Sequence, residues 1–166
     1  MKNLKLTFLT LAFATFLVSC SKDGATGPAG ANGATGATGN ANVEIFTFNV
    51  DNSSWIADSA NLQWSTDYTL PSSANVSGGV FLYIKDGGNW AALPHVDYGQ
   101  TFEFGYDPTT RIVEVQSADA TAMTMIPNPG PDTFRVVCIP PAGRIANPNL
   151  DYKNYNEIQS TFHLKK

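Results

Sequence analysis

The sequence is poor in cysteine and in basic residues, and its apolar runs are short. Among 166 residues it has two cysteines, Cys20 and Cys138, and 10 lysines and arginines against 14 aspartates and glutamates. The basic residues are scattered, which argues against a nucleic-acid partner, because such partners bind to clustered basic surfaces. The longest apolar run, residues 6–18, falls short of the about 20 residues that a membrane-spanning helix needs.

Motifs of common catalytic and cofactor sites are also missing. We find no G-x-S-x-G or H-E-x-x-H motif, no phosphate-binding loop, no dinucleotide-binding fingerprint and no calcium-binding loop. His95 precedes Asp97 by two residues, so in a strand both would share one face, but no third metal ligand is evident. We therefore expect no metal and no cofactor, and we assign no catalytic residue.

The N-terminus has the three parts of a secretory signal. Lys2 and Lys5 precede the apolar run, and a small residue stands before Cys20. The stretch LVSC, residues 17–20, resembles the lipobox of bacterial lipoproteins, in which the signal is removed and the cysteine is acylated. This resemblance implies that residues 1–19 are cleaved and that Cys20 attaches the protein to a membrane, because two or more acyl chains anchor stably. The alternative is an ordinary signal peptide that ends at a cysteine.

Glycine occupies every third position from Gly24 to Gly39. This is the period of collagen, in which only glycine fits at the axis of three chains. Collagen-like sequences also contain about 15–20% proline or more, whereas these triplets contain only Pro28. We therefore expect residues 20–42 to be a flexible linker of a monomeric protein, and a trimer joined through the triplets is the alternative.

The residues SKD that follow Cys20 indicate a location. They resemble the short signals that direct some Gram-negative lipoproteins to the outer surface. The resemblance implies an outer-membrane lipoprotein exposed on the cell surface. A second acid that such signals normally contain is replaced by Gly24, so a location facing the periplasm is the alternative.

Residues 43–166 have the pattern of one β domain. Runs rich in β-branched and aromatic residues alternate with turn signals, and expected strands or hairpins lie at residues 42–50, 62–70, 78–95, 101–117 and 133–140. With turns at short intervals and no helical pattern before residue 149, we predict an antiparallel β-sandwich of about seven to eight strands. In residues 101–117, Asp107 and Pro108 suit a type I turn, with Val113 and Val115 pointing inward.

The clearest hairpin signal is the turn at residues 86–88. Its glycines tolerate positive φ angles, which hairpin turns require. The sequence does not define the length of the loop or the register of the two strands. A one-residue shift decides whether Tyr83 faces Trp90 or Ala91.

The last predicted strand has two largely apolar faces. Phe134, Val136 and Cys138 alternate with Arg135, Val137 and Ile139, so we expect a central strand that is partly covered on its outer side, and we expect Cys138 to be a buried, inert thiol. After this strand the period changes. Tyr155, Ile158 and Phe162 have helical spacing, which predicts a short C-terminal helix against one end of the sheet, with Asp151 as its N-cap.

The whole layout resembles a group of uncharacterised lipoproteins of Gram-negative bacteria. The likeness rests on the lipobox, the glycine triplets and three short words, GNANV at residues 39–43, WAALP at residues 90–94 and FRVVCIP at residues 134–140. It implies a location and an architecture, and it implies no activity.

Aromatic residues are the candidates for ligand binding. Exposed rings can stack on sugars or anchor a protein partner, and the candidates are Trp55, Trp64, Tyr83 and Trp90. The alternative is that these rings fill the sandwich core. We therefore expect a lipid-anchored binding or structural module of the cell envelope with a glycan or protein ligand. The alternative is an envelope hydrolase acting on polysaccharide, because two carboxylates can come from distant positions.

Overall fold

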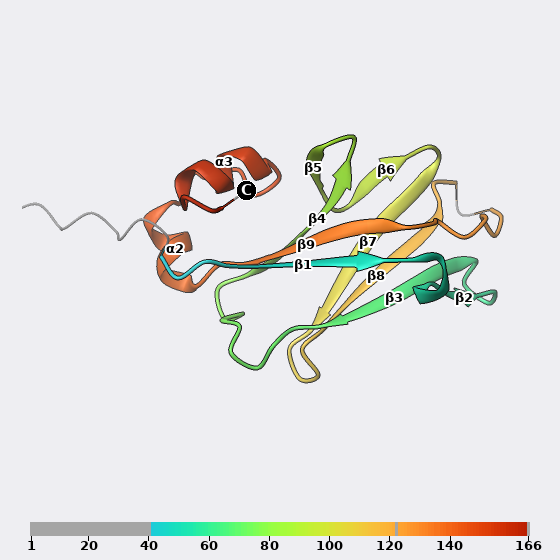
Figure 1. Ribbon diagram of the computed structural model, residues 1–166, viewed down its shortest axis with the longest axis horizontal. Helices are drawn as coiled ribbons and strands as arrows, with labels where there is room; N and C mark the ends of the chain where they lie inside the picture. The colour runs from blue at the N-terminus through green and yellow to red at the C-terminus, as the bar shows by residue number, and fades with distance from the viewer. Residues whose placement is uncertain (1–40, 122, 166) are drawn as a thin grey trace, which may run out of the picture. The chain divides into compact units, whose positions relative to one another are not determined.

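The computed structural model describes residues 41–121 and 123–165 (Figure 1). The predicted signal peptide, the lipidation site Cys20 and the glycine triplets up to residue 40 lie outside these residues, so they stay predictions. No helix in the described part of the chain is long and apolar enough to cross a membrane.

Nine strands of the described residues form two antiparallel sheets, so the predicted β-sandwich is confirmed. The four-stranded sheet has the order β1-β9-β4-β5, and the five-stranded sheet has the order β2-β3-β8-β7-β6. The strands exceed the expected seven to eight because β2 and β6 have only three residues each, too few for a sequence pattern. The strands are β1 (Glu44–Val50), β2 (Ile56–Asp58), β3 (Gln63–Thr69), β4 (Val80–Asp86), β5 (Asn89–Ala92), β6 (His95–Asp97), β7 (Gln100–Asp107), β8 (Ile112–Asp119) and β9 (Asp132–Cys138).

The main core lies between the two sheets. Side chains alternate along each strand, so β9 contributes its face of Phe134, Val136 and Cys138, all fully buried. Val113 and Val115 of β8 meet this face from the other sheet, as predicted. The ring of Phe134 lies at the centre, with ring centroids 5.5 Å from Phe48, 6.3 Å from Trp55 and 6.4 Å from Phe102.

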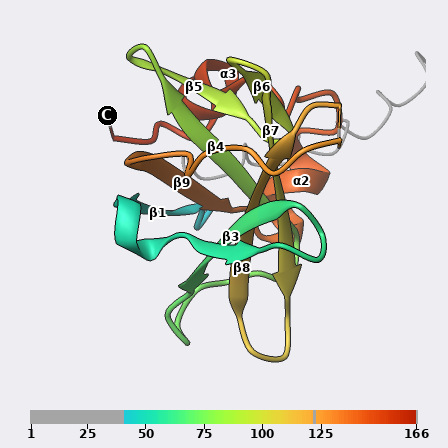
Figure 2. The same cartoon turned by 90° about the vertical axis from the view of Figure 1, so that its right-hand side faces the viewer.

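A second core lies on the outer face of the four-stranded sheet, where helix α3 (Tyr155–Thr161) covers it. Buried side chains from the sheet and from the helix segment form one cluster there: Val43, Tyr83, Val137, Ile139, Tyr155, Ile158 and Phe162. The helices α2 (Pro141–Ala146) and α3 lie toward one end of the sandwich in Figure 1 and behind the strands in Figure 2. The helical spacing and the covered outer face of β9 are therefore confirmed.

The N-cap of α3 differs from the prediction. Asn154, not Asp151, precedes the helix, and its side chain accepts a hydrogen bond from the backbone N–H of Glu157. Asp151 instead accepts a hydrogen bond from the backbone N–H of Lys153. Both residue types suit this role, and the sequence could not rank them because the helix begins later than expected.

The β4–β5 hairpin has a two-residue loop, Gly87 and Gly88, between the paired residues Asp86 and Asn89. Both glycines have positive φ angles, 54° and 109°, as the turn requires. Lys85 is opposite Trp90, so Tyr83 is opposite Ala92 and faces neither of the two residues considered from the sequence. Tyr83 and Trp90 nevertheless share the outer face of the sheet, because Trp90 lies two residues from Ala92, the residue opposite Tyr83.

Candidate functional site

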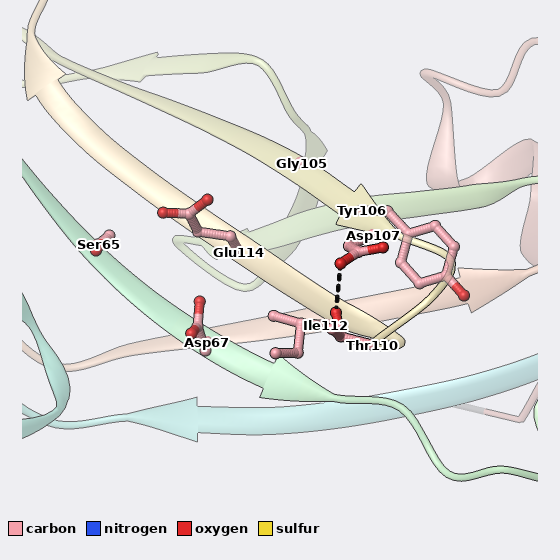
Figure 3. A pocket seen from close by; sticks show the side chains of 8 residues that line it. All are labelled: Ser65, Asp67, Gly105, Tyr106, Asp107, Thr110, Ile112 and Glu114. Atoms are coloured by element: carbon pink, nitrogen blue, oxygen red, sulfur yellow. Dashed lines mark hydrogen bonds between the residues drawn. The ribbon is translucent and has the colours of Figure 1, made fainter.

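The outer face of the five-stranded sheet carries two polar hollows that follow each other along β8. One has a volume of about 540 Å³ and lies near the β7–β8 turn (Figure 3). The other has a volume of about 280 Å³ and lies toward the opposite end of β8. Both are lined by side chains of β3, β7 and β8. We call this surface the acidic face and define it by its polar residues Gln63, Ser65, Asp67, Thr101, Glu103, Asp107, Thr110, Glu114 and Gln116, together with Gly105.

Strand register brings these side chains together. Asp67 of β3 is opposite Glu114 of β8, and Glu114 is opposite Gly105 of β7. In Figure 3 the side chains of Asp67 and Glu114 rise from the neighbouring strands β3 and β8, and Gly105 is labelled on β7, on the other side of β8. A Cβ added at Gly105 would meet no atom within 4 Å, so the missing side chain leaves open space at this point.

The charges of the acidic face are not explained by stability of the fold. Directly opposite residues have Cβ atoms about 4.5–5.5 Å apart, and like charges in such pairs are destabilising. Asp67 and Glu114 form such a pair. Glu103 is the outward residue of β7 next to Gly105, which is opposite Glu114. On the described strands β3, β7 and β8, no outward position holds a lysine or arginine. A ligand that donates hydrogen bonds to these carboxylates would offset their repulsion.

The β7–β8 turn fixes a further carboxylate at one end of the face. Asp107 accepts a hydrogen bond of 2.7 Å from the Thr110 hydroxyl, drawn in Figure 3, and one of 2.8 Å from the Thr109 backbone N–H. These hydrogen bonds lower the pKa of Asp107, that from the Thr110 side chain most of all. Its carboxylate is therefore ionised at neutral pH and held in one orientation.

Two of the four candidate aromatic residues are buried in the cores. Trp55 is 5% exposed and donates its indole N–H to the Gly130 carbonyl at 2.7 Å. Tyr83 is fully buried, and its hydroxyl donates to the Tyr152 carbonyl at 2.6 Å. Burial, above all, raises the pKa of Tyr83. Neither ring faces solvent, so their role in the described structure is packing.

The other two candidates are half-buried and lie on different surfaces. Trp64 points inward from β3 and donates its indole N–H to the Ile126 carbonyl at 2.9 Å. Trp90 lies on the outer face of the four-stranded sheet, against Tyr155. The structure therefore does not bring the four rings together into one platform.

His95 and Asp97 share one side of β6, as their spacing predicts, but they do not build a metal site. His95 Nε2 lies 3.6 Å from Asp86 Oδ2. The negative charge of Asp97 acts on Asp132, whose pKa is raised to about 6, first by burial and then by this charge. Among the described residues, no group of three or more His, Cys, Asp or Glu side chains is placed to hold a metal ion.

The thiol of Cys138 is buried in the main core, as predicted. Burial, followed by the negative charge of Glu44, raises the pKa of Cys138 to about 11. A thiol with this pKa stays protonated at neutral pH, and the protonated form is neither a nucleophile nor a metal ligand. Cys138 is therefore a packing residue.

Comparisons of the chain with protein-family models, with curated proteins and with solved structures found no match. The chemistry of the acidic face is therefore the guide to function. Sequence reasoning missed this face because Asp67 and Glu114 meet only through the pairing of β3 with β8. The acids of β7 and β8 alternate with apolar residues in the sequence, and this alternation was the one signal that could have indicated them.

Proposed function

We propose that this protein is a lipid-anchored module of the bacterial cell envelope that binds a glycan through the acidic face. The observation that carries the proposal is the hollowed row of carboxylates, amides and hydroxyls on β3, β7 and β8. Carboxylates accept hydrogen bonds, whereas amides and hydroxyls both accept and donate them, so together they match the hydroxyl groups of a sugar. The single sign of charge favours a neutral or basic glycan.

A glycan fits this face better than a protein does. The cavity of about 540 Å³ lies in the usual range of about 300–1,000 Å³ for small-ligand sites. Centres of protein interfaces are depleted of charged residues and enriched in aromatic ones. The acidic face has the opposite composition, with Asp67, Glu103 and Glu114 near its centre.

Hydrolysis of a polysaccharide is the second candidate function, and the pair Asp67 and Glu114 favours it. Glycosidases use two carboxylates about 5–10 Å apart, and side chains of opposite residues on neighbouring strands, whose Cβ atoms are about 4.5–5.5 Å apart, can reach the lower end of this range. The general acid of such enzymes is desolvated by apolar surroundings. Asp67 is exposed and Glu114 is half-buried in a cavity lined by polar groups, so the geometry favours binding without cleavage.

The anchor is the other part of the proposal. Cys20 would carry the lipid, residues 21–42 would form the linker, and the β-sandwich would face outward from the outer membrane as a monomer. The lipobox and the SKD signal support this arrangement.

Native electrophoresis tests the binding proposal. The full-length protein in mild detergent would be run through gels that contain a neutral glucan, mannan, xylan or galactan, or the basic glycan chitosan. We expect retardation by at least one polysaccharide, and we expect Asp67→Asn and Glu114→Gln to abolish it. Glu157→Gln on α3 serves as the control, because it removes a charge far from the acidic face and should leave retardation unchanged.

The same gels separate the two candidate functions. Retardation without release of reducing ends supports binding. Release of reducing ends by the unmodified protein, and not by either acidic-face variant, supports the hydrolase. Retardation that is equal in all variants, or retardation by no polysaccharide of the panel, would show that the acidic face does not bind these glycans.

A further inference from the structure

A separate pocket lies on the outer face of the other sheet, beside α3. It has a volume of about 270 Å³ and is formed by the β4–β5 hairpin, by β9 and by α3. Its lining combines Arg135 and Trp90 with Asn156 and Gln159 of α3, whereas Asn89 borders it from the end of the hairpin. We call it the Arg135 pocket.

The guanidinium of Arg135 is held in one position. Its Nε donates to the Thr47 hydroxyl at 3.1 Å, and its Nη1 donates to the Tyr155 hydroxyl at 2.5 Å. Its central carbon lies 4.1 Å from the centroid of the Trp90 ring and 5.3 Å from that of Tyr155. An arginine that is stacked and hydrogen-bonded in this way loses little further freedom when it binds a ligand.

No acid in the part of the chain that the structure describes forms an ion pair with Arg135. Among the described residues, the one ion pair with nitrogen and oxygen within 4.0 Å joins His95 and Asp86, not Arg135. The strand register places Thr47, Asn49, Thr133 and Lys85 at the outward positions around it. No outward position of the described strands β1, β4, β5 and β9 holds an acid. The pocket therefore offers a fixed cation with guanidinium N–H groups beyond the two already used.

We propose that the Arg135 pocket binds the carboxylate of an acidic sugar, a hexuronate. A guanidinium pairs with a planar carboxylate through two parallel hydrogen bonds. The carboxamides of Asn156 and Gln159 supply donors and acceptors for the neighbouring hydroxyl groups of the sugar ring, Gln159 beyond the N–H that it donates to the Leu164 carbonyl. The volume fits one sugar residue, and Trp90, which lines the pocket, supplies an apolar surface for the C–H groups of the ring.

An acidic peptide matches the pocket less well. Its side-chain carboxylate would satisfy Arg135, but its methylene groups would form no hydrogen bonds with the side chains of Asn156 and Gln159. The site is independent of the acidic face, because the two surfaces belong to different sheets and carry opposite charge. Either site can fail experimentally without affecting the other.

Ligand-observed saturation-transfer NMR tests the proposal with two matched sugars. Glucuronate and glucose differ only by a carboxylate in place of a hydroxymethyl group. With the full-length protein in mild detergent, we expect the Kd for glucuronate to be at least about tenfold lower than that for glucose. Equal dissociation constants, or no transfer to glucuronate, would overturn the proposal.

Three variants locate the site. Arg135→Gln should raise the Kd for glucuronate at least about tenfold. Asn156→Asp should do the same, because it places a carboxylate beside the guanidinium at an exposed position where folding is not at risk. Lys85→Gln is the control: it removes an exposed cation of the same face outside the pocket and should change the Kd by less than about twofold.

The variants also show which result would refute the site. If Arg135→Gln loses its fold by circular dichroism, Asn156→Asp decides alone. Unchanged glucuronate binding in Asn156→Asp, or an equal loss in Lys85→Gln, would place the binding elsewhere. Displacement of glucuronate by a lower concentration of the dipeptide Glu-Glu would show that the pocket selects an acidic peptide, and the assignment to a sugar would be wrong.

Discussion

Replacing Asp132 by asparagine is expected to stabilise the protein at neutral pH and not at acidic pH. Asp132 begins β9 and is half-buried, and its Oδ2 atom is buried with no hydrogen-bond partner in the described structure. Burial raises the pKa of Asp132 to about 6, with a smaller contribution from the charge of Asp97. Ionisation of this carboxyl group therefore opposes folding.

The sign and size follow from the linkage between protonation and folding. The folded-state pKa lies above the ordinary aspartate value, so the folded state holds the proton more tightly. The stability that this group contributes is present below about pH 4 and is lost as the pH rises through about 6. The difference between 3.8 and about 6 corresponds to about 3 kcal/mol. Because Asp132 is only half-buried and solvent screens its charge, we expect about 1–1.5 kcal/mol.

Urea denaturation followed by tryptophan fluorescence measures this effect. Asp132→Asn should raise the free energy of unfolding by about 1–1.5 kcal/mol near pH 7.5 and by less than about 0.5 kcal/mol near pH 4. Asp58→Asn is the control with the opposite sign: hydrogen bonds from the Asn61 side chain and backbone lower the pKa of Asp58, so this variant should lose stability at neutral pH. A gain that is equal at both pH values, or no gain near pH 7.5, would refute the account of Asp132.

Three further predictions concern the core, a close backbone contact and the anchor. Phe134→Ala should lower the free energy of unfolding by about 3–5 kcal/mol in urea denaturation, because Phe134 is fully buried among three rings; a loss below about 1 kcal/mol would mean that the core collapses around the cavity. Gly78→Ala should lower the melting temperature measured by circular dichroism, because the added Cβ would collide with the Ile139 carbonyl oxygen. Gly105→Ala is the control: its Cβ meets only open space, so the melting temperature should be nearly unchanged. Similar melting temperatures of the two variants would contradict this packing. Cys20→Ala should move the protein out of the membrane fraction after cell fractionation, and a protein that stays with the membrane would show that the anchor lies elsewhere.

Patterns among residues close together in the sequence were sufficient to predict the main strands and the C-terminal helix. The two largely apolar faces of β9 predicted a central strand partly covered on its outer side, and the structure places β9 between β1 and β4 under α3. The spacing of Tyr155, Ile158 and Phe162 predicted α3 for the same reason. Such patterns are reliable because the period of a helix or strand is a property of the backbone itself.

The candidate sites depend on pairings that no local pattern contains. Asp67 meets Glu114 because β3 pairs with β8, and Arg135 meets Trp90 and Tyr155 because β9, β5 and α3 converge. Of the aromatic residues that the sequence suggested for binding, Trp55, Trp64 and Tyr83 pack in or against the cores, and Trp90 lines the Arg135 pocket. Burial depends on the face of the sheet that each strand register selects. By itself, the sequence determined the β-sandwich and predicted an address at the membrane. Only the tertiary structure decided which side chains converge, because contacts between distant segments are set by strand pairing and packing.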